Sequence, residues 1–273
     1  MENIFKNPKE LVDSLKNEGY VIGERLSVAL YLALAKGKPL FLEGEAGVGK
    51  TEIAKTLASI LKTPLIRLQC YEGLDISQSS YEWNYGKQLI SIQSTDNKNI
   101  DLFSEDFLIE RPLLKALRQK PSERAVLLID ELDRADEAFE AYLLEFLSDW
   151  QITIPEIGSI KTEEPPIVVI TSNRTREVHD ALKRRCYYSW VDYPDKDTEL
   201  EILKHRVPQT GPTLQTELVN FVQHLREEEL YKSPGIAETI DWAEALVELN
   251  CVALDPQTID STIGVLLKYQ DDI

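Results

Sequence analysis

The sequence predicts an α/β fold, in which a parallel sheet is covered by helices and is followed by an all-helical segment. Short continuous apolar runs, typical of strands buried on both faces, occur at Pro39–Glu43, Ala125–Ile129 and Pro166–Thr171. Segments with helical spacing separate these runs, which is typical of a parallel αβα arrangement. After Pro194 no further run is typical of a strand, so we expect only helices in the remainder.

The other elements follow from their local patterns. Apolar residues at helical spacing predict helices at Pro8–Leu34 with breaks at Gly19 and Gly23, Thr51–Leu61, Leu108–Gln119, Asp136–Trp150 and Val178–Arg185. A further strand is expected at Pro64–Cys70, and Ile152–Pro155 is followed by a turn at Gly158. The alternating segment Tyr81–Gln93, with Asn84-Tyr85-Gly86 near its start, predicts a β-hairpin insert.

The length of 273 residues suits a large domain and a smaller one. We expect an α/β core at residues 1–194 and a helical lid domain of three or four helices at residues 195–273. Within the lid, Glu227–Glu229 and Ser233–Gly235 are the expected breaks between helices.

The chain is strongly acidic, with 47 acidic and 30 basic residues and a formal net charge of −17. Such a surface repels phosphate backbones, whose binding needs clustered Lys and Arg, so we expect no nucleic-acid partner. Residues 196–273 hold 15 acidic and 6 basic residues, which gives a net charge of −9 for this segment. The acidic segment is either a solvated helical face or a docking surface for a basic partner.

The cysteines and histidines predict neither a disulfide framework nor a zinc site. Cys70, Cys186 and Cys251 lie far apart, and the three histidines show no ligand spacing, which is typical of reduced thiols and structural histidines. No apolar run approaches the ~20 residues that a membrane span needs, and the N-terminus has no signal-like stretch. We therefore expect a cytoplasmic protein without a membrane span.

A phosphate-binding loop follows the first predicted strand. The pattern G-x-x-x-x-G-K-[ST] is matched by Gly44, Glu45, Ala46, Gly47, Val48, Gly49, Lys50 and Thr51. Its glycines let backbone amides cradle phosphate oxygens at the start of the next helix. Lys50 would bring a positive charge to the β and γ phosphates of ATP, and the Thr51 hydroxyl would ligate Mg²⁺.

Two acids end the apolar run Ala125–Ile129. Asp130 can hold Mg²⁺ through its hydration shell, and Glu131 can polarise the water that attacks the γ phosphate. Solvated acids at the end of a strand are the structural alternative. A phosphate loop about 80 residues upstream with a strand between them favours the catalytic interpretation, because adjacent acids of this kind suit hydrolysis.

Polar residues follow the next apolar run and the short helix after it. Asn173 can hold the attacking water in line, or it can be an ordinary turn residue. Lys183-Arg184-Arg185 ends the predicted helix Val178–Arg185. Arginine can stabilise the charge that spreads over a transferring phosphoryl group, whereas the structural alternative is a basic helix end that complements the helix dipole.

The order of the phosphate loop, LLIDELDRAD, VITSN and ALKRRC, followed by a helical segment, resembles the AAA+ ATPases. The stretches YEWNYGKQL, ALKRRCYYSWVDYP and SPGIAETIDWAEAL are similar to those of the MoxR family, and in particular to its CoxD-type members. This resemblance covers about Gly23 to Leu249.

The resemblance implies roles for individual residues. Lys50 and Thr51 would be Walker A, Asp130 and Glu131 Walker B, and Asn173 sensor 1. Arg185 would be the arginine finger, with Arg184 as its neighbour or substitute. The Tyr81–Gln93 hairpin would be the insert that faces the pore or the client, and Arg134 would lie near a subunit interface.

One feature of the family is missing. Many AAA+ proteins carry a sensor-2 arginine at the start of a lid helix, whereas Ser233-Pro234-Gly235-Ile236-Ala237-Glu238 has none. Arg226 and Lys232 are the nearby basic residues that could substitute.

The resemblance also implies a function and partners. It predicts an ATP-hydrolysing, Mg²⁺-dependent hexameric ring that remodels a client protein. The expected client is a molybdenum hydroxylase apoprotein or its maturation machinery, and the expected co-chaperone is a von Willebrand factor A-domain protein. Two alternatives stay open at this point. One is a nucleotide-gated scaffold without catalysis, and the other is an AAA+ ATPase that acts on nucleic acid, against which the net charge of −17 argues.

Overall fold

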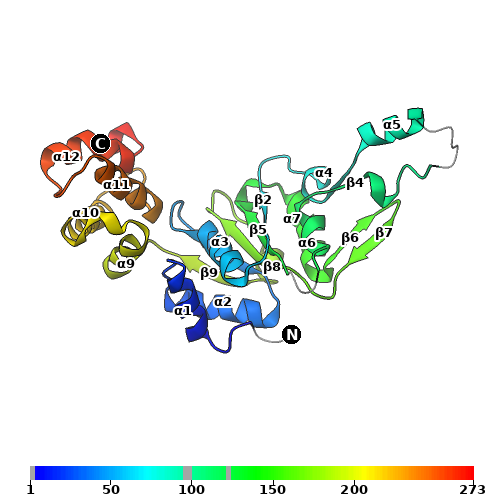
Figure 1. Cartoon of the computed structure of the whole chain (residues 1–273), viewed down its shortest axis with the longest axis horizontal. Helices are drawn as coiled ribbons and strands as arrows, with labels where there is room; N and C mark the ends of the chain where they lie inside the picture. The colour runs from blue at the N-terminus through cyan, green and yellow to red at the C-terminus, as the bar shows by residue number, and fades with distance from the viewer. Residues whose placement is uncertain (1–3, 95–99, 121–123) are drawn as a thin grey trace.

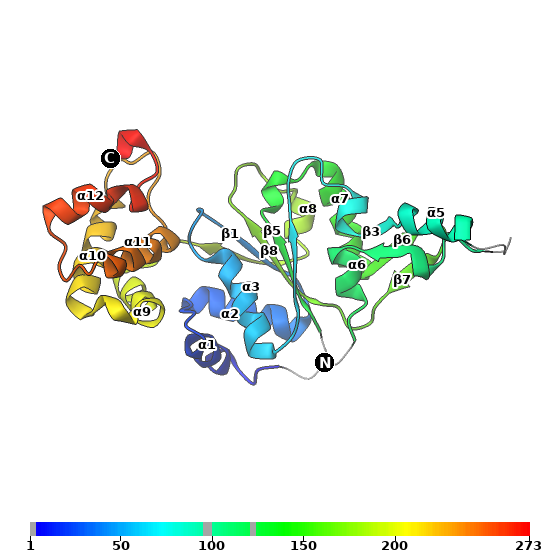
Figure 2. The ribbon, with the colours of Figure 1, turned by 45° about the horizontal axis from the view of Figure 1, so that its top comes forward.

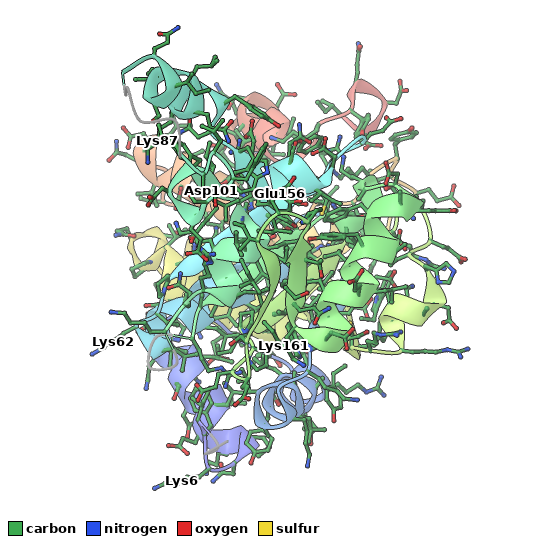
Figure 3. All side chains as sticks on the ribbon, turned by 90° about the vertical axis from the view of Figure 1, so that its right-hand side faces the viewer. Lys6, Lys62, Lys87, Asp101, Glu156 and Lys161 are labelled. Carbon is green, nitrogen blue, oxygen red and sulfur yellow. The ribbon has the colours of Figure 1, made fainter. Side chains whose placement is uncertain are left out.

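The computed structural model describes residues 4–94, 100–120 and 124–273. An α/β body occupies the middle of an elongated molecule, with the C-terminal helices at one end and an insert at the other (Figures 1 and 2). Figure 3 views the molecule from the insert end, where Lys87 of the insert and Lys6, before the first helix, lie at opposite edges. No helix in these described ranges is both long and apolar enough to cross a membrane.

A five-stranded parallel sheet forms the centre of the body. Its order is β2 (Leu65–Gln69), β5 (Val126–Asp130), β8 (Ile167–Ser172), β1 (Leu40–Gly44) and β9 (Tyr187–Val191). This arrangement confirms the predicted α/β class. The edge strand β9 was not predicted, because its YYSWV sequence is only partly buried and lacks a continuous apolar run.

Helices cover both faces of the sheet. The first face packs against α1 (Pro8–Asn17), α2 (Glu24–Lys36) and α3 (Lys50–Leu61). The second packs against α6 (Pro112–Leu117), α7 (Glu137–Asp149) and α8 (Asp180–Lys183). Side chains of β5 alternate between the two cores, with Leu128 in the first and Leu127 in the second. Because successive side chains of a strand point to opposite faces, a continuous apolar run supplies both cores at once.

The predicted hairpin at Tyr81–Gln93 is wrong. Tyr81–Trp83 forms strand β3, which pairs antiparallel with β4 (Leu108–Glu110), and Tyr85–Ser94 is helix α5. Asn84 does not occupy a turn but accepts a hydrogen bond from the Lys87 amide at 2.9 Å. A short polar side chain at this place satisfies an unpaired amide of the first helical turn, so the same residue begins a helix.

Other local differences are small. The predicted helix Leu108–Gln119 begins later, at Pro112, because residues 108–110 pair with β3. The turn at Gly158 joins β6 (Gln151–Ile154) and β7 (Gly158–Lys161) in an antiparallel hairpin. The short helices are α4 (Ile76–Ser79), η1 (Glu105–Phe107), η3 (Leu132–Arg134), η4 (Pro208–Thr210) and η5 (Gln270–Asp272).

The C-terminal segment is helical, as predicted. It consists of α9 (Lys196–Arg206), α10 (Pro212–Leu225), α11 (Ile236–Glu248) and α12 (Pro256–Leu266) with the short η4 and η5. These helices share a separate apolar core around Trp242, whose indole N–H donates to the Thr262 hydroxyl at 2.9 Å. Separate cores are typical of units that move relative to each other.

A buried ion pair ties the C-terminal helices together. The Glu199 carboxylate, with no exposed surface, accepts hydrogen bonds from Arg226 Nη1 and Nη2, each at 2.8 Å, and from the Thr239 hydroxyl at 2.8 Å. Arg226 is thereby committed to the interior of this segment, and it also donates to the Pro234 carbonyl at 2.8 Å.

Truncation of Trp242 tests the C-terminal core. Trp242→Ala is expected to lower the free energy of unfolding by ~3–5 kcal/mol, the usual cost of removing a buried aromatic side chain. Urea unfolding followed by circular dichroism measures this change. The control is Val252→Ala, since Val252 is 85% exposed, and a similar loss in both variants would contradict the assigned core.

Candidate functional site

A pocket of about 410 Å³ lies where the C-terminal edge of the sheet meets the C-terminal helices. It is lined by residues 19–21, 46–52, Lys55, Asp130, Glu131, Thr171, Asn173, Ile202, Arg206, Ile236, Ala237, Ile240 and Asp241. The pocket thus brings together most of the predicted loop, both predicted acids and Asn173. Ligand sites in open parallel sheets lie at this edge, beyond the carboxyl ends of the strands.

The predicted loop connects β1 to α3 and folds around its own lysine. The Lys50 ammonium donates to the Gly44 carbonyl at 2.7 Å and to the Glu45 carbonyl at 2.5 Å. Gly47 and Gly49 have φ angles of +78° and +89°, a region that favours glycine. The sequence motif therefore encodes the backbone shape directly.

Burial lowers the pKa of Lys50 to about 8. The carboxylates of Asp133, Glu45, Asp130 and Glu131 act in the opposite direction, because negative charges favour the ammonium form. Lys50 is only 6% exposed, so the loss of hydration outweighs these four charges. An anion that enters the pocket would supply the compensating charge.

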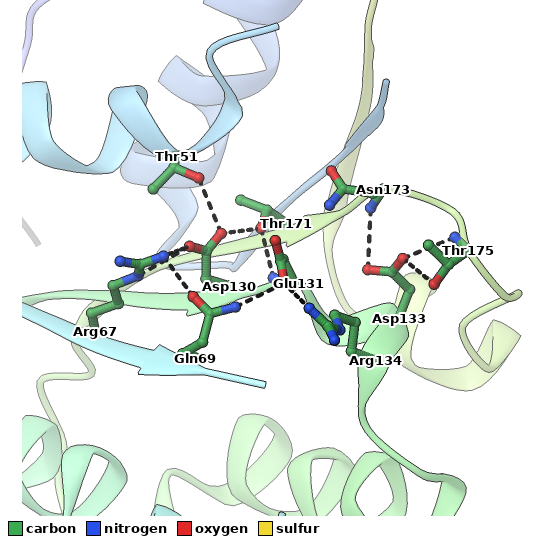
Figure 4. Close-up of polar contacts among 10 residues, drawn as sticks. All are labelled: Thr51, Arg67, Gln69, Asp130, Glu131, Asp133, Arg134, Thr171, Asn173 and Thr175. Carbon is green, nitrogen blue, oxygen red and sulfur yellow. Dashed lines mark hydrogen bonds and ion pairs between the residues drawn. The ribbon is translucent and has the colours of Figure 1, made fainter. Parts of the chain in front are cut away.

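Asp130 is the most heavily hydrogen-bonded acid of the pocket (Figure 4). Its Oδ1 accepts from the Thr51 hydroxyl at 3.1 Å and from the Thr171 hydroxyl at 2.5 Å. Its Oδ2 accepts from Arg67 Nε at 3.0 Å and Nη2 at 2.5 Å. Side chains from α3, β8 and β2 therefore orient one carboxylate at the end of β5.

Glu131 has a strained backbone conformation. Its φ of +54° lies in the left-handed region, which costs of order 1–3 kcal/mol for a residue with a side chain and clusters at functional sites. The Glu131 amide donates to the Thr171 hydroxyl at 2.9 Å, and its carboxylate accepts from Gln69 at 3.0 Å and from Arg134 at 3.3 Å. These contacts direct the carboxylate along the pocket edge (Figure 4).

Asp133 fixes the segment that carries Asn173. Its carboxylate accepts hydrogen bonds from the Asn173 amide at 3.1 Å and from the Thr175 amide and hydroxyl at 2.9 and 2.7 Å. Asp133 is 2% exposed, and its three donors satisfy the desolvated charge. The chain after β8 is thereby held close to the chain after β5 (Figure 4).

Arg184 and Arg185 lie outside the pocket of their own chain. Arg185 donates from Nε to the Ser148 hydroxyl at 2.6 Å and from Nη1 to the Ala181 carbonyl at 3.0 Å. Arg184 forms an exposed ion pair with Asp180 at 2.7 Å. Neither guanidinium group lines the pocket of its own chain.

The C-terminal helices contact the loop through backbone at the start of α11. The Ala237 amide donates to the Gly47 carbonyl at 3.0 Å, and the Glu238 carboxylate caps the Gly235 amide at 3.0 Å. A Cβ on Gly235 would lie 2.8 Å from the Gly47 carbonyl carbon. Only glycine permits this approach.

The predicted substitutes for the missing lid arginine do not line the pocket. Arg226 is paired with Glu199, and Lys232 is exposed, with its backbone amide donating to the Asp272 carboxylate at 3.2 Å. Arg206 of α9 lines the pocket instead and pairs with Glu52 at 2.9 Å.

Sequence reasoning missed several residues that line the pocket or hold its acids. Arg67 and Gln69 share one face of β2 and contact Asp130 and Glu131, and Thr171, which lines the pocket, ends the apolar run of β8. The signal was available, because polar residues at the carboxyl ends of parallel strands gather at one edge. Arg206 carried no such signal, since its position depends on how α9 packs beside α3.

The oxygen donors of the pocket suit a hard divalent cation. The Thr51 hydroxyl and the Asp130 carboxylate approach each other to 3.1 Å and both line the pocket. Hydroxyl, carboxylate and water oxygens are the ligands that Mg²⁺ prefers. Residues 4–94, 100–120 and 124–273 contain no cluster of three or more His, Cys, Asp or Glu side chains of metal-binding geometry.

A protein-family comparison matches residues 39–186 to the AAA domain of the dynein-related subfamily. This match spans more than half of the chain. The protein belongs to this AAA family. Membership confirms the predicted AAA+ class and gives the protein an ATPase-type, nucleotide-binding function in the general sense of the family.

Relatives of this AAA protein occur in staphylococci. An uncharacterized protein of Staphylococcus epidermidis is 27% identical over 223 residues, which cover 79% of this chain and 78% of the relative. An uncharacterized protein of Staphylococcus aureus is 27% identical over 244 residues, which cover 86% of each chain.

Solved structures share the fold. A RuvB variant of Thermotoga maritima matches 98% of this chain and 75% of its own, with a TM-score of 0.53 and 19% identity. A Cytophaga hutchinsonii protein with ATPase in its name matches 94% of this chain and 85% of its own, with a TM-score of 0.50 and 16% identity. At these identities the likeness concerns the AAA+ fold.

Substitution of Gly235 tests the contact between α11 and the loop. Gly235→Ala is expected to destabilise the protein by ~1–3 kcal/mol, the usual cost of overpacking, because the new methyl group meets the Gly47 backbone. The control is Gly264→Ala in α12, where nothing lies within 4 Å of the new Cβ and where alanine should stabilise the helix by ~0.5–1 kcal/mol. Urea unfolding measures the free energy of unfolding of both variants. A Gly235→Ala variant that is more stable than the parent would contradict the contact.

Proposed function

We propose that this AAA protein binds ATP together with Mg²⁺ in the pocket and hydrolyses it to ADP and phosphate. The observation that carries the proposal is the convergence of Lys50, Asp130, Glu131 and Asn173 on one pocket of about 410 Å³. These residues come from three separate parts of the chain, because Asp130 and Glu131 are adjacent. A phosphate-binding loop, two acids and a polar amide at one edge form the set that phosphoryl transfer to water requires.

In this proposal the loop and α3 bind the phosphates. Backbone amides of residues 44–51 would face the phosphate oxygens at the N-terminus of α3, where the helix dipole favours anions. When ATP binds, the Lys50 ammonium would release the carbonyl oxygens of Gly44 and Glu45 and donate to the β and γ phosphates in their place. Thr51 and Asp130 would hold Mg²⁺, which when bound neutralises developing charge on the phosphates.

The chemical step would belong to Glu131 and Asn173. The Glu131 carboxylate would accept a proton from the attacking water while the bond between the γ phosphorus and its bridging oxygen breaks. Gln69 and Arg134 orient that carboxylate, and Asn173 would hold the water in line. The strained backbone at Glu131 agrees with a residue positioned for chemistry.

Arg185 would complete the site of a neighbouring subunit. It is exposed and does not line its own pocket, whereas an arginine at the transferring phosphoryl group accelerates such reactions strongly. An arginine supplied by a neighbour requires an oligomer, and we propose a ring of six. Arg184 would be its neighbour or substitute.

We further propose that hydrolysis drives the remodelling of a client protein, as expected for a MoxR-type chaperone of the CoxD kind. The proposed client is a molybdenum hydroxylase or its maturation machinery, and the proposed co-chaperone is a von Willebrand factor A-domain protein. The core would comprise residues 1–194 and the lid residues 195–273, with nucleotide between them. The net charge of −9 in residues 196–273 supports docking of a basic or metal-bearing partner.

The first experiment measures ATP turnover and the mass in solution, with and without ATP and Mg²⁺. Turnover that rises together with a ring-sized species is expected.

Arg185→Ala should then lower the rate of ATP hydrolysis by ~10³–10⁵-fold, the usual value of an arginine finger, with nearly unchanged ATP affinity. Arg184→Ala, the matched control, should lower it less. Normal turnover by Arg185→Ala would exclude the assigned arginine, and tight ATP binding by a monomer without turnover would favour a nucleotide-gated scaffold.

The pKa of Lys50 predicts how ATP affinity depends on pH. Because burial lowers this pKa to about 8, the free protein holds the ammonium form only below that pH, and the phosphates require it. Affinity should therefore be full below pH 8 and fall by up to ~tenfold per pH unit above it. Calorimetric titration with ATP between pH 7 and pH 9.5 measures the effect. Lys50→Arg keeps its charge over this range, so an equal decline in that variant would contradict the assignment.

A further inference from the structure

A second ion pair, whose carboxylate is buried and whose ammonium is partly exposed, joins β1 to α8. Glu43, at the end of β1, is 3% exposed, and its Oε1 accepts from the Lys183 ammonium at 2.8 Å. Its Oε2 accepts from the Tyr188 hydroxyl at 3.0 Å. None of these three residues lines the pocket, so the hydrolytic site makes no direct use of them.

The surroundings of the pair are apolar. The Lys183 ammonium lies 5.6 Å from the ring centre of Phe41 and 6.0 Å from that of Tyr188. Burial, together with the hydrogen bond to Glu43 and its negative charge, raises the pKa of Tyr188 to about 12, which keeps its hydroxyl a donor. Ion pairs contribute little net stability at the surface, and in the interior they stabilise little compared with apolar side chains of similar volume. A role in positioning is therefore a better account of this pair than stability.

The two ends of the pair connect to the two halves of the proposed catalytic apparatus. Glu43 immediately precedes Gly44, whose carbonyl accepts from Lys50 at 2.7 Å. Lys183 immediately precedes Arg184 and Arg185 at the end of α8. The pair therefore joins the phosphate loop of a subunit to the arginine segment of the same subunit, although the two lie about 140 residues apart in the sequence.

We propose that the Glu43–Lys183 ion pair is a positioning contact. It holds Arg184 and Arg185 at the end of α8 in the position from which Arg185 reaches the pocket of the neighbouring subunit. This inference rests on the proposed function, in which Arg185 acts in trans. Arg185 is otherwise held by hydrogen bonds to Ser148 and to the Ala181 carbonyl. The ion pair adds the link to β1 and so to the loop that contacts nucleotide. A shift of the loop on binding is transmitted to α8 through this direct, partly buried contact.

The experiment separates the subunit that gives the arginine from the subunit that uses it. The donor carries Glu131→Gln, so it keeps Arg185 but cannot hydrolyse ATP. The acceptor carries Arg185→Ala, so it has an intact pocket but no arginine to give. ATP turnover that appears only when the two are mixed measures the arginine acting in trans.

The pair is then removed from one partner at a time. Glu43→Gln combined with Lys183→Met removes both charges, so that neither is left buried alone. In the donor, this double substitution is expected to lower the restored turnover by ~10- to 100-fold, the usual effect of misplacing a catalytic group by about 1 Å. In the acceptor, it is expected to leave the restored turnover and the KM for ATP unchanged. Lys183→Arg in the donor keeps the charge and should retain turnover.

Three results would overturn the inference. An equal loss of restored turnover, whether the double substitution is in the donor or in the acceptor, would mean that the pair serves only the phosphate loop of its own subunit. Full turnover with the double variant in the donor would mean that the pair positions nothing. No turnover in the mixture of the Glu131→Gln donor and the Arg185→Ala acceptor would reject the trans arginine of the proposed function itself. This failure is distinguishable from a failure of the ion-pair inference, because the mixture is measured before the pair is changed. Thermal unfolding of the double variant, compared with exposed Lys36→Met, verifies that the fold is retained.

Discussion

The hydrogen bonds around the Asp130 carboxylate constrain the whole functional edge of this AAA protein. Asp130 is 3% exposed, and a buried carboxylate is tolerated only when its oxygens are satisfied. Thr51, Thr171 and Arg67 supply the donors from α3, β8 and β2. The requirement to satisfy one charge therefore aligns the loop helix with three neighbouring strands, and it places Glu131, the next residue, at the pocket edge.

The same constraint extends toward the insert. Strand β2 carries Arg67 and Gln69 to the two acids and then continues through Cys70, whose amide donates to the Asp130 carbonyl at 2.9 Å. Beyond Cys70 the chain enters α4, β3 and α5. Helix α5 lies at the opposite end of the molecule from the C-terminal helices (Figures 1 and 2). The stretch of chain from β2 to α5 thus leads from the polar edge of the pocket to the far end of the molecule.

Close backbone packing takes the place of a charged contact at the other side of the pocket. Where many AAA+ proteins carry a lid arginine, Gly235 packs directly on Gly47, and the Ala237 amide bonds to the Gly47 carbonyl. A side chain at either glycine would separate the two segments. The position of α11 against the loop therefore follows from the shapes of two glycines, while Arg226 stabilises the interior of the C-terminal helices through Glu199.

The sequence by itself determined the features whose causes are local. The loop at Gly44–Thr51 needs glycines at φ angles that other residues avoid, and the runs of β5 and β8 are apolar because both faces are buried. Those features were sufficient to predict the parallel sheet, the helical C-terminus and the convergence of Asp130, Glu131 and Asn173. Each of them depends on residues that are neighbours in the chain or that end adjacent strands.

Only the tertiary structure decided the features that depend on distant partners. Asn84 begins a helix and not a turn because β3 pairs with β4, more than 20 residues away. Strand β9 forms because β1 offers it an edge, although its own residues are only partly buried. Arg206 reaches the pocket and Lys183 reaches Glu43 through the packing of helices against other elements. Such contacts leave no periodic pattern in the sequence, because each is fixed by where two remote segments meet.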